Sequence, residues 1–297
     1  MKERLRISFL KYHGCGNDFL VIDELERERI PEEFRGKLAI LLCKRRFGVG
    51  ANAILYVLPS TYASAKMRVF PADGSEVDIC GNGIRCVADY LCSRLERDEV
   101  LIDTNDGMKH VEKMNGLYKV TLGNLRTTKS GVGDLNLEIP ANEKLLNRKM
   151  EFPNLGEVEI SIVRAGEPHG VIFVDDVDKE NLVKYGKAIA ANRGIFPYGV
   201  HVNLVQVVDA STIKIRTYER GVWDETLACG TGATASAAVS YITGRVKEKG
   251  IKVKVKGGEL IVNLVKDVLF LTGPAARVYE GTTTIDLESL SNVTIRP

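Results

Sequence analysis

The sequence of 297 residues has no long apolar run and almost no net charge. No segment approaches the roughly 18 consecutive apolar residues of a membrane-spanning helix. The N-terminus, MKERLRISFLKYHG, lacks the sustained apolar stretch of a secretory signal peptide. Lysine and arginine total 41 against 39 aspartate and glutamate residues, which excludes a general attraction to nucleic acid or membrane surfaces. We therefore expect a cytoplasmic protein with no nucleic-acid or membrane partner.

The cysteines and histidines lack the spacing of a metal site. The chain has six cysteines and four histidines, and no two cysteines form a Cys-x-x-Cys pair. In the cytosol cysteines stay reduced, so we expect thiols and no structural zinc. A phosphate-binding loop and a dinucleotide fingerprint are also missing. The residues concerned are Cys15, Cys43, Cys80, Cys86, Cys92, Cys229, His13, His110, His169 and His201.

The apolar pattern predicts many strands and few helices. The composition, 44% hydrophobic and 27% charged, is ordinary for a globular chain of one large or two medium domains. Helical spacing predicts helices over 84–95 and 233–242, with further candidates at 32–46 and 178–194. Alternating apolar residues predict half-buried strands over 6–12, 53–59, 65–70, 110–114, 118–122, 158–163, 170–176, 213–218, 251–256, 260–266, 268–273 and 293–297.

One long segment recurs in the second half of the chain. KMRVFPADGSEVDICGNG (66–83) parallels KIRTYERGVWDETLACGTG (214–232), with Lys-to-Cys spacings of 14 and 15. A weaker parallel joins HGCGNDFLVID (13–23) to EPHGVIFVDD (167–176), each interpreted as a His-Gly turn that enters a strand. Identities and order recur together, so we expect two homologous halves, each a sheet wrapped on a central helix. The boundary is expected near 124–135.

Both copies of the repeat place Cys-Gly-x-Gly at the start of a predicted helix. A helix N-terminus has unpaired N–H groups and the positive end of the helix dipole, so a cysteine there has a lowered pKa. The glycines let the backbone approach a ligand, and their N–H groups can hold a carboxylate. A single copy is weak support, because free cysteine is often only a small buried hydrophobe. We interpret Cys15, Cys43, Cys86 and Cys92 in that way.

Two such cysteines on opposite sides of one ligand could invert a carbon that bears an acidic hydrogen. One thiolate would remove the proton from one face, and the opposing thiol would deliver a proton to the other. Two bases are needed, because a single base tends to return the proton to the same face. Oriented backbone N–H groups would stabilise the carbanion beside the carboxylate, the more so in a dry cleft.

Four motifs in this chain resemble the diaminopimelate epimerase family: YHGCGNDFLVID, ADGSEVDICGNGIRCVADYL, GEPHGVIFVDD and YERGVWDETLACGTGATASAA. They stand in that family's order and span nearly the whole chain. The resemblance implies an isomerase of amino-acid (lysine) biosynthesis that uses no pyridoxal phosphate or other cofactor. It implies an α+β fold of two pseudo-symmetric halves, each a curled, mostly antiparallel sheet around a central α-helix. The halves would be 1–126 with 276–297, carrying Cys80, and 127–275, carrying Cys229, with the active site in the cleft between them.

By motif, the resemblance makes Cys80 and Cys229 the acid/base pair. His169 of EPH and Glu219 of YERG would sit beside the thiols and support proton transfer. The backbone at Gly81–Asn82 and Gly230–Thr231 would hold the carboxylate of the reacting centre. Asn17 of GNDF would contact the substrate, and Arg220 would meet its distal end, a carboxylate held by bidentate pairing.

The chain departs from the family pattern on the substrate-selecting side. Pro71 stands where the family usually has an Asn that contacts the substrate. Glu167 and His201 each stand where the family usually has Asn. The pair Asn52-Ala53 stands where the family has Asp-Gly or Asp-Gln. The loop before Cys-Gly-Thr-Gly is one residue longer than the commonest form. Neither Cys-Gly-x-Gly unit is changed. The negative charge of Glu167 would suit a cationic group in the substrate.

Three functions therefore stay open at this point. The first is a two-base epimerase of LL-/meso-diaminopimelate, and the second is a racemase of another, basic amino acid such as lysine, histidine or ornithine. The third is a non-catalytic ligand-binding or thiol-sensing protein on the same fold. Isomerases of the phenazine-biosynthesis type lack the cysteine pair, and proline racemases usually carry His where Asn82 stands. The small-molecule substrate is an amino acid in the first two cases, and a homodimer stays open.

Overall fold

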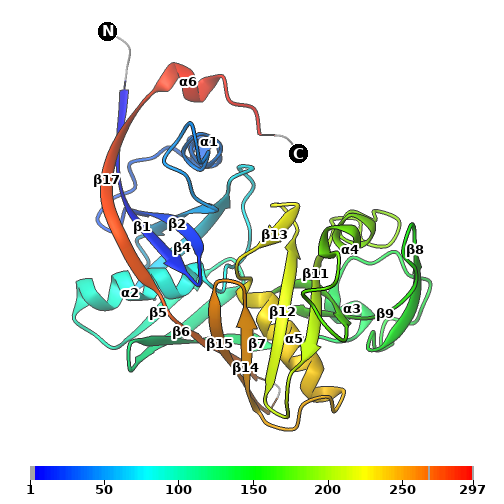
Figure 1. Cartoon of the computed structure of the whole chain (residues 1–297). Coiled ribbons are helices and arrows are strands. Elements are labelled where there is room, and N and C mark those ends of the chain that lie inside the picture. Colours follow the sequence, from blue (N-terminus) through cyan, green and yellow to red (C-terminus); the bar gives the residue numbers. More distant parts are fainter. Residues whose placement is uncertain (1–3, 267, 296–297) are drawn as a thin grey trace. The chain divides into compact units, whose positions relative to one another are not determined.

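The chain forms two compact units in the computed structural model, which describes residues 4–266 and 268–295. The first unit comprises the chain up to Val120 together with the segment from Pro274 onward, and the second comprises Thr121–Gly273. Figure 1 labels most of the elements of both. Within the described residues, no helix combines the length and the apolar character that a membrane crossing requires.

The first unit is a sheet with two long helices and a short one. Its strands follow the order β17-β1-β2-β3-β4-β5-β6-β7. The last strand, β7, extends past Val120 into the second unit. The elements are β1 (Arg4–Gly14), β2 (Asn17–Asp23), α1 (Glu32–Leu42), β3 (Ala53–Leu58), β4 (Ala65–Pro71), α2 (Gly83–Leu95), β5 (Glu99–Thr104), β6 (Gly107–Met114), β7 (Leu117–Asn124), β17 (Ala276–Asp286) and α6 (Leu287–Ser291).

The second unit has a closely similar plan. Its strands follow the order β8-β9-β10-β11-β12-β14-β15-β16, and β13 forms an extra pairing on β12. The elements are α3 (Lys129–Val132), β8 (Arg148–Phe152), β9 (Gly156–Ala165), β10 (Glu167–Phe173), α4 (Leu182–Ile189), β11 (His201–Val207), β12 (Thr212–Glu219), β13 (Asp224–Thr226), α5 (Gly230–Ile242), β14 (Gly250–Val255), β15 (Gly258–Val265) and β16 (Val268–Gly273).

Strand directions repeat in the same order in both units. From β1 to β7 the successive pairings are antiparallel, parallel, antiparallel, parallel, antiparallel and antiparallel. From β9 to β16, leaving out β13, the series is identical. Both units also add an antiparallel strand at the first edge, β17 on β1 and β8 on β9. The predicted α+β fold of two similar halves is therefore confirmed.

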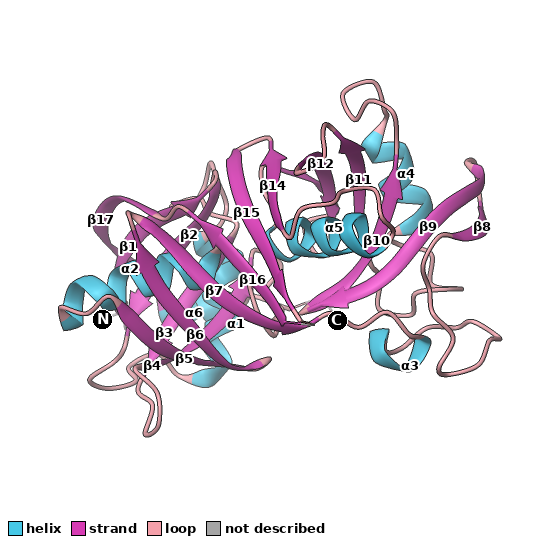
Figure 2. Ribbon diagram, turned by 90° about the horizontal axis from the view of Figure 1, so that it is seen from below, coloured by secondary structure: helices cyan, strands magenta, loops and turns pink. Residues whose placement is uncertain are grey.

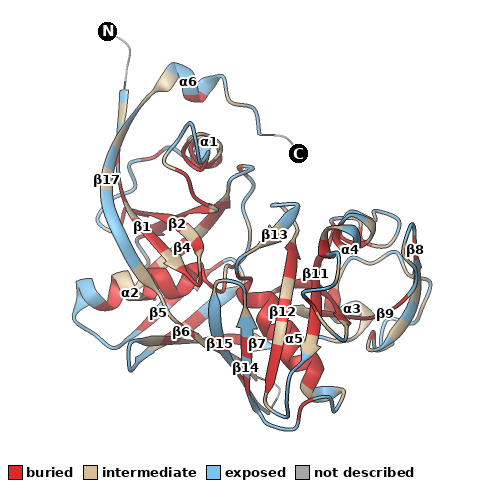
Figure 3. Ribbon diagram, viewed as in Figure 1, coloured by how far each residue is buried: buried red, intermediate tan, exposed pale blue. Residues whose placement is uncertain are grey.

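In each unit one helix is enclosed by the sheet. Helix α2 contacts β1 to β6 and β17, and α5 contacts β9 to β12 and β14 to β16. Figure 2 shows α5 lying along its strands, and Figure 3 shows that most of α5 and the first half of α2 are buried. The small Ala and Ser side chains of α5 allow packing on all sides, whereas α2 is amphipathic and exposes its last turn. Both cysteine motifs thus begin a central helix.

The register of the strands supports the longer sequence repeat and corrects the shorter one. The match between 66–83 and 214–232 is in register, because Lys66 pairs with Leu58 where Lys214 pairs with Gln206 in the equivalent strands. The weaker parallel, between 13–23 and 167–176, is wrong in how it aligns the two His-Gly dipeptides. His13-Gly14 ends β1, whereas His169-Gly170 lies inside β10. The shared dipeptide is a coincidence, since strand pairing aligns the start of β2 with the start of β10.

Element boundaries also differ from the prediction. Helices α1 and α4 end earlier than expected, at Leu42 and Ile189. The predicted strand 293–297 is wrong for 293–295, which form no regular element, and 296–297 lie outside the described residues. Strands β5, β8, β11, β13 and β17 were not expected. Strand β17 lies at the sheet edge on β1 and is mostly exposed, so it lacks a continuous apolar face.

Candidate active site

Cys80 lies three residues before Gly83, the first residue of helix α2, and its sulfur binds the start of that helix. Its Sγ accepts the backbone N–H of Gly83 at 3.3 Å, and its carbonyl accepts the N–H of Ile84, the second residue of α2, at 2.9 Å. A Cβ on Gly83 would lie 3.0 Å from a Leu55 methyl carbon, so the helix start packs closely on β3. The sequence therefore places this sulfur at the positive end of the helix dipole.

Asn17 binds the first sulfur, and Arg85 binds the two residues that follow Cys80. Asn17, the first residue of β2, accepts from the Cys80 thiol at 3.9 Å and from Asn82 Nδ2 at 3.2 Å. Arg85 is fully buried and donates to Gly81 O and Asn82 Oδ1, each at 2.8 Å, and to Pro274 O at 3.2 Å. A buried cation beside this motif makes the surroundings of Cys80 electropositive.

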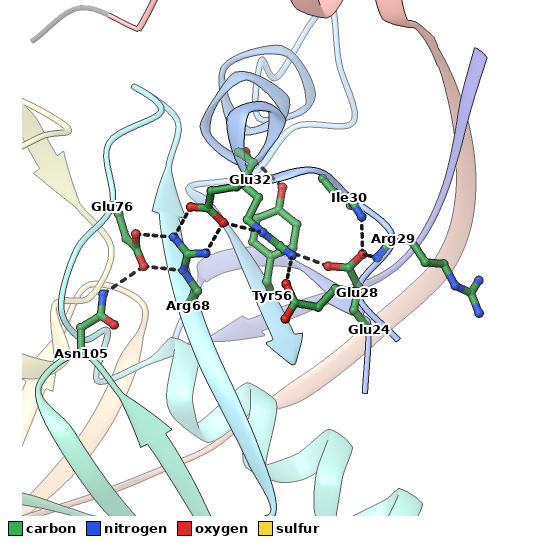
Figure 4. Close-up of polar contacts among 10 residues, drawn as sticks. Glu24, Glu28, Arg29, Ile30, Glu32, Tyr56, Arg68, Glu76 and Asn105 are labelled. Carbon is green, nitrogen blue, oxygen red and sulfur yellow. Dashed lines mark hydrogen bonds and ion pairs between the residues drawn. The ribbon is translucent and has the colours of Figure 1, made fainter. Parts of the chain in front are cut away.

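An ion-pair network anchors the loop that leads to Cys80 (Figure 4). Arg68 on β4 holds Glu76 of that loop through two hydrogen bonds of 2.7–2.8 Å and Glu32 of α1 through two of 2.5–2.6 Å. Asn105 adds a hydrogen bond to Glu76 at 2.9 Å. The planar guanidinium suits this double bidentate contact. Arg68 therefore connects the loop before Cys80, helix α1 and strand β4 to one another.

Fully buried Arg35 continues the network on the other side of Glu32. It donates to Glu24 at 2.8 Å and to Glu28 at 2.9 Å, and its guanidinium carbon lies 4.7 Å from the Tyr56 ring centroid. Glu24 also accepts the backbone N–H groups of residues 29 and 30. Every buried charge in this cluster thus has a partner, as a buried ion pair requires.

Cys229 repeats the arrangement of Cys80 in the second unit. It caps α5: its Sγ accepts the Gly232 N–H at 3.3 Å, and its carbonyl accepts the Ala233 N–H at 2.9 Å. Thr231 Oγ1 lies 3.5 Å from the sulfur. The two distances from sulfur and carbonyl to the helix are thus the same in both units. The local geometry follows from Cys-Gly-x-Gly, because the glycine three residues on has no Cβ to obstruct the sulfur.

Glu219, the last residue of β12, supplies an acid with a strongly perturbed pKa beside Cys229. Burial raises the pKa of the Glu219 carboxyl group from 4.5 to about 7, against hydrogen bonds from Thr226 and Cys229 that favour the ionised form. Thr226 Oγ1 donates to Oε1 at 2.5 Å. Near neutral pH this carboxyl group can therefore both accept and donate a proton, which suits general acid–base chemistry.

His169 and His201 form a stacked, neutral pair in neighbouring strands. Their rings lie 4.7 Å apart at 22°, and the two residues are register partners in the parallel pair β10–β11. Burial and the nearby Arg220 lower the pKa of His201 to about 3, and burial, His201 and two arginines lower the pKa of His169 well below 6.5. His201 Nδ1 accepts the Arg220 N–H at 3.2 Å, which places the ring proton on Nε2.

Asn203 is a site residue that the sequence analysis missed. It is fully buried on β11, and its Nδ2 donates to Gly170 O at 3.0 Å and lies 3.2 Å from His169 Nδ1. Its Oδ1 accepts from Thr217 at 2.9 Å and lies 2.5 Å from where a Cβ on Gly232 would be. Because Nδ2 is a donor, His169 Nδ1 accepts and Nε2 carries the proton. That buried Nε2 has no hydrogen-bond partner among the described residues. The sequence feature that could have indicated Asn203 is a single amide side chain within the otherwise apolar run HVNLV.

Glu167 and Arg220 form an ion pair at the same end of the second unit. Glu167 begins β10, two residues before His169, so both side chains leave one face of the strand. Its Oε2 accepts from Arg220 Nη2, and its side chain is 9% exposed against 23% for Arg220. The distal-end residues predicted from the sequence thus contact each other.

Three possible metal ligands converge in this unit, since ligand atoms of His201, Glu219 and Cys229 lie within 4.8 Å of one another. The hydrogen-bond pattern argues against using them together for a metal. His201 Nδ1 is engaged by a backbone N–H, and Nε2 then carries a proton, so neither nitrogen offers a lone pair without rearrangement. The cluster is better suited to proton transfer.

The remaining four cysteines are buried. Burial raises the pKa of Cys43 to about 12 and also raises those of Cys15, Cys86 and Cys92. A thiol that is hard to ionise is a poor nucleophile and a poor base. These four cysteines are therefore poor candidates for proton transfer.

Comparison with known proteins decides the family. A sequence model described as "Diaminopimelate epimerase" matches residues 9–127 and 161–278. The chain belongs to the diaminopimelate epimerase family. A relative named diaminopimelate epimerase from Methanocella arvoryzae is 39% identical over 96% of this chain and 99% of its own length. Another of that name from Archaeoglobus fulgidus is 39% identical over 93% and 96%. The resemblance drawn from the four motifs is confirmed.

Solved structures support the fold of this family member. A hydroxyproline epimerase from Agrobacterium vitis aligns over 96% of this chain and 94% of its own, with a TM-score of 0.71 and 15% identity. A protein of the phenazine-biosynthesis PhzF family from Bacillus anthracis aligns over 94% and 99%, with a TM-score of 0.65 and 18% identity. Such low identities establish the shared fold alone.

Each unit gathers its own share of the predicted site residues. In the first unit, Cys80, Gly81, Asn82 and Asn17 lie together around the start of α2. In the second, the grouped residues are His169, His201, Glu167, Glu219, Arg220, Cys229, Gly230 and Thr231. Pro71 and Ala53, two of the departures, are register partners in β4 and β3.

Proposed function

We propose that the protein is a cofactor-independent diaminopimelate epimerase that inverts an α-carbon by two-base proton transfer between thiols. Membership of a family whose named relatives are diaminopimelate epimerases supports the substrate. The observation that carries the mechanism is the matched pair of sulfurs, each bound by the N–H three residues on at 3.3 Å. Pyridoxal phosphate is not needed, because the thiols and the helix N-termini supply the base, the acid and the carboxylate site.

In the proposed step, a thiolate takes the α-hydrogen as a proton and an S–H bond forms. The electron pair of the broken C–H bond stays on the α-carbon and spreads into the adjacent carboxylate. The opposing thiol then gives its proton to the other face, so one C–H bond forms as one S–H bond breaks. The N-terminal backbone of α2 and α5, at Gly81–Asn82 and Gly230–Thr231, would hold the carboxylate and stabilise the developing charge.

The surroundings of the sulfurs suggest different resting charges. Fully buried Arg85 lies beside the Cys80 motif, and a positive charge favours a thiolate there. Cys229 lies beside Glu219, whose carboxyl group is part-ionised near pH 7, and a negative charge favours a protonated thiol. We infer that Cys80 is the resting base and Cys229 the resting acid for one direction of the reaction. Glu219 would return Cys229 to its starting protonation state after each turnover.

The other residues have supporting roles in this proposal. His169, held by Asn203 with its proton on Nε2, would donate a hydrogen bond to the substrate, and its neutral ring adds no charge beside the thiol. Asn17 would contact the α-amino acid end from the first unit. His201, Glu167 and Arg220 would form the distal pocket.

The proposal also assigns one catalytic cysteine to each half of the chain. The halves 1–126 with 276–297 and 127–275 would enclose the active site between them, with one cysteine from each. We place the enzyme in the cytoplasm, acting on a free amino acid and on neither nucleic acid nor membrane. A homodimer is compatible with this scheme, and light scattering of the purified chain would decide it.

Exchange of the α-hydrogen tests the proposal directly. Fully reduced protein is incubated with LL- or meso-diaminopimelate in deuterated water without added cofactor, and deuterium at the α-carbon is followed by NMR. We expect exchange and interconversion in the wild type. Cys80→Ala and Cys229→Ala should each abolish interconversion, whereas Cys92→Ala, on the second half of α2, should keep it. Ligand binding without exchange by the reduced wild type would favour the thiol-sensing alternative and refute the epimerase.

A further inference from the structure

Arg85 is a fully buried cation that contacts no carboxylate in the described part of the chain. It lies in the first turn of α2 and donates to Gly81 O and Asn82 Oδ1, each at 2.8 Å, and to Pro274 O at 3.2 Å. All three acceptors are neutral. A buried charge is normally balanced by an opposite charge, because its desolvation costs free energy. The guanidinium thus has hydrogen-bond partners, but no acidic residue balances its charge.

The chain makes room for the Arg85 side chain with a glycine. Gly14 ends β1, and a Cβ at that position would lie 3.0 Å from Arg85 Nη2 and 3.4 Å from Asn82 Cβ. A separation of 3.0 Å is shorter than an ordinary van der Waals contact, so a larger residue would displace the guanidinium. Two motifs of the sequence, YHGCGNDF and CGNGIR, therefore meet at Arg85.

Arg85 also fixes the orientation of two amide side chains near the first sulfur. A guanidinium only donates hydrogen bonds, so Asn82 turns its oxygen toward Arg85 and its Nδ2 toward Asn17. Asn17 Oδ1 accepts from that Nδ2 at 3.2 Å, and the same oxygen lies 3.9 Å from Cys80 Sγ. An acceptor therefore faces the sulfur, where it can bind the S–H group that forms when Cys80 takes a proton.

The second unit makes the equivalent hydrogen bond without a charge. Arg85 and Thr234 each stand five residues after the cysteine that begins the motif of their unit. Arg85 Nη1 donates to the carbonyl of Gly81, and Thr234 Oγ1 donates to that of Gly230, both at 2.8 Å. These two glycines directly follow the cysteines. Because a hydroxyl group is enough to bind this carbonyl, what the arginine adds in the first unit is a positive charge.

We propose that Arg85 is a positioning residue for Cys80: the Cys80 thiolate balances its charge, and its hydrogen bonds orient the groups around that sulfur. This inference rests on the proposed function above, in which Cys80 exchanges a proton with the α-carbon. The thiols whose negative charge would stabilise the Arg85 cation are those of Cys86, Cys15 and Cys80. Burial raises the pKa of Cys86 and of Cys15, so neither supplies the anion near neutral pH. Cys80 is only partly buried, and its sulfur accepts a helical N–H, which favours a thiolate there.

Alkylation of the reduced protein reports the charge of each thiol without turnover. Iodoacetamide is applied over a series of pH values, and mass spectrometry of the peptides follows Cys80 and Cys229 separately. In the wild type, we expect the midpoint pH for Cys80 to lie below that for Cys229. In Arg85→Met the midpoint for Cys80 should rise by about one pH unit or more, because a neighbouring opposite charge shifts a pKa by that much. The midpoint for Cys229 should not move. Arg85→Lys keeps the charge and should keep a low midpoint for Cys80.

Thr234→Val is the matched control, because it removes the equivalent hydrogen bond and changes no charge. It should leave the midpoint for Cys80 where it is in the wild type. Steady-state kinetics with diaminopimelate measures the effect on the reaction. In Arg85→Met, kcat should fall about 10–100-fold with KM less affected, because less of the bound enzyme carries the thiolate. Arg85→Lys should restore most of kcat. Thermal unfolding of each variant checks that the fold is retained.

The possible failures are distinguishable. If folded Arg85→Met keeps the wild-type midpoint for Cys80, the charge pairing is overturned, and a raised KM would then assign the arginine to the bound carboxylate. Unchanged kcat in that variant overturns the role in the reaction. If Arg85→Met does not fold, the wild type still decides, because a midpoint for Cys80 at or above that for Cys229 overturns the pairing. If the midpoints respond as expected but the wild type exchanges no α-hydrogen of diaminopimelate, the proposed epimerase fails while the pairing stands.

Discussion

Replacing Glu219 by Gln should stabilise the protein at alkaline pH while it removes activity. The pKa of this carboxyl group is about 7 in the folded protein against 4.5 as its ordinary value. The folded state therefore binds the proton more tightly than the unfolded chain does. Its contribution to stability is full below about pH 4.5, and it is lost as the pH rises through about 7. Gln cannot ionise, so Glu219→Gln avoids that loss.

The size of the effect follows from the two pKa values. A difference of about 2.5 units corresponds to about 3 kcal/mol, because one unit is 1.36 kcal/mol. The destabilisation of the folded protein by ionised Glu219 grows with pH, because the folded state holds the proton more tightly than the unfolded chain. It is under about 1 kcal/mol at pH 5 and about 3 kcal/mol at pH 8. The Gln carbonyl can still accept from Thr226, so that hydrogen bond subtracts little. We expect Glu219→Gln to gain roughly 2–3 kcal/mol more at pH 8 than at pH 5.

Urea unfolding of the wild type and Glu219→Gln at both pH values measures this difference, and Glu151→Gln is the control that should show none. The proposed return of Cys229 to its starting protonation also predicts a loss of kcat in the same variant. Equal effects of Glu219→Gln on the free energy of unfolding at pH 5 and pH 8 would refute the raised pKa. Unchanged kcat would refute the proton-transfer role.

Three further changes test particular contacts. Asn203→Leu removes the hydrogen bond that orients His169, and we expect kcat to fall about 10–100-fold with KM less affected, as kinetics at saturating substrate would show. Arg35→Met leaves the buried Glu24 carboxylate without its guanidinium and should cost about 3–5 kcal/mol in urea unfolding. Gly186→Ala places a Cβ 2.2 Å from Tyr218 Cγ and should destabilise by about 1–3 kcal/mol, visible as a lower Tm. An unchanged value in any of the three would contradict the contact concerned.

The duplicated plan could be predicted from the sequence because it rests on local patterns. Alternating apolar residues mark the strands of both halves, and the Cys-Gly-x-Gly motif marks the start of α2 and α5. The spacing from Lys to Cys, 14 and 15 residues, agrees with equivalent register positions in β4 and β12. Edge strand β17 escaped prediction, because an exposed strand need not have an apolar face and its place beside β1 joins residues about 280 positions apart.

The contacts within the candidate site depend on pairing between strands and were harder to predict. Asn203 looks like one polar residue in an apolar strand, and only the parallel register of β10 and β11 brings it beside His169. The ion pair of Glu167 with Arg220 joins positions 53 residues apart. The raised pKa of Glu219 arises from burial by neighbouring chain segments, which composition and spacing do not reveal.

Equivalent register positions show how the two halves have diverged. Gly83 packs on Leu55, and Gly232 packs on Asn203 in the same place of the second half. In the first half, Ala53 at the start of β3 pairs with Pro71 at the end of β4. At the corresponding place of the second half, His201 begins β11, Glu219 ends β12, and their ligand atoms lie within 4.8 Å of each other.

The ionisable groups at these positions therefore belong to the second half, where the first half has apolar residues. Identical surroundings would give the two cysteine thiols the same tendency to ionise, so that in the proposed mechanism either thiol could be the resting base. In the proposed mechanism, the ionisable residues of the second half would make the surroundings of Cys229 differ from those of Cys80, although both helix starts keep the same geometry.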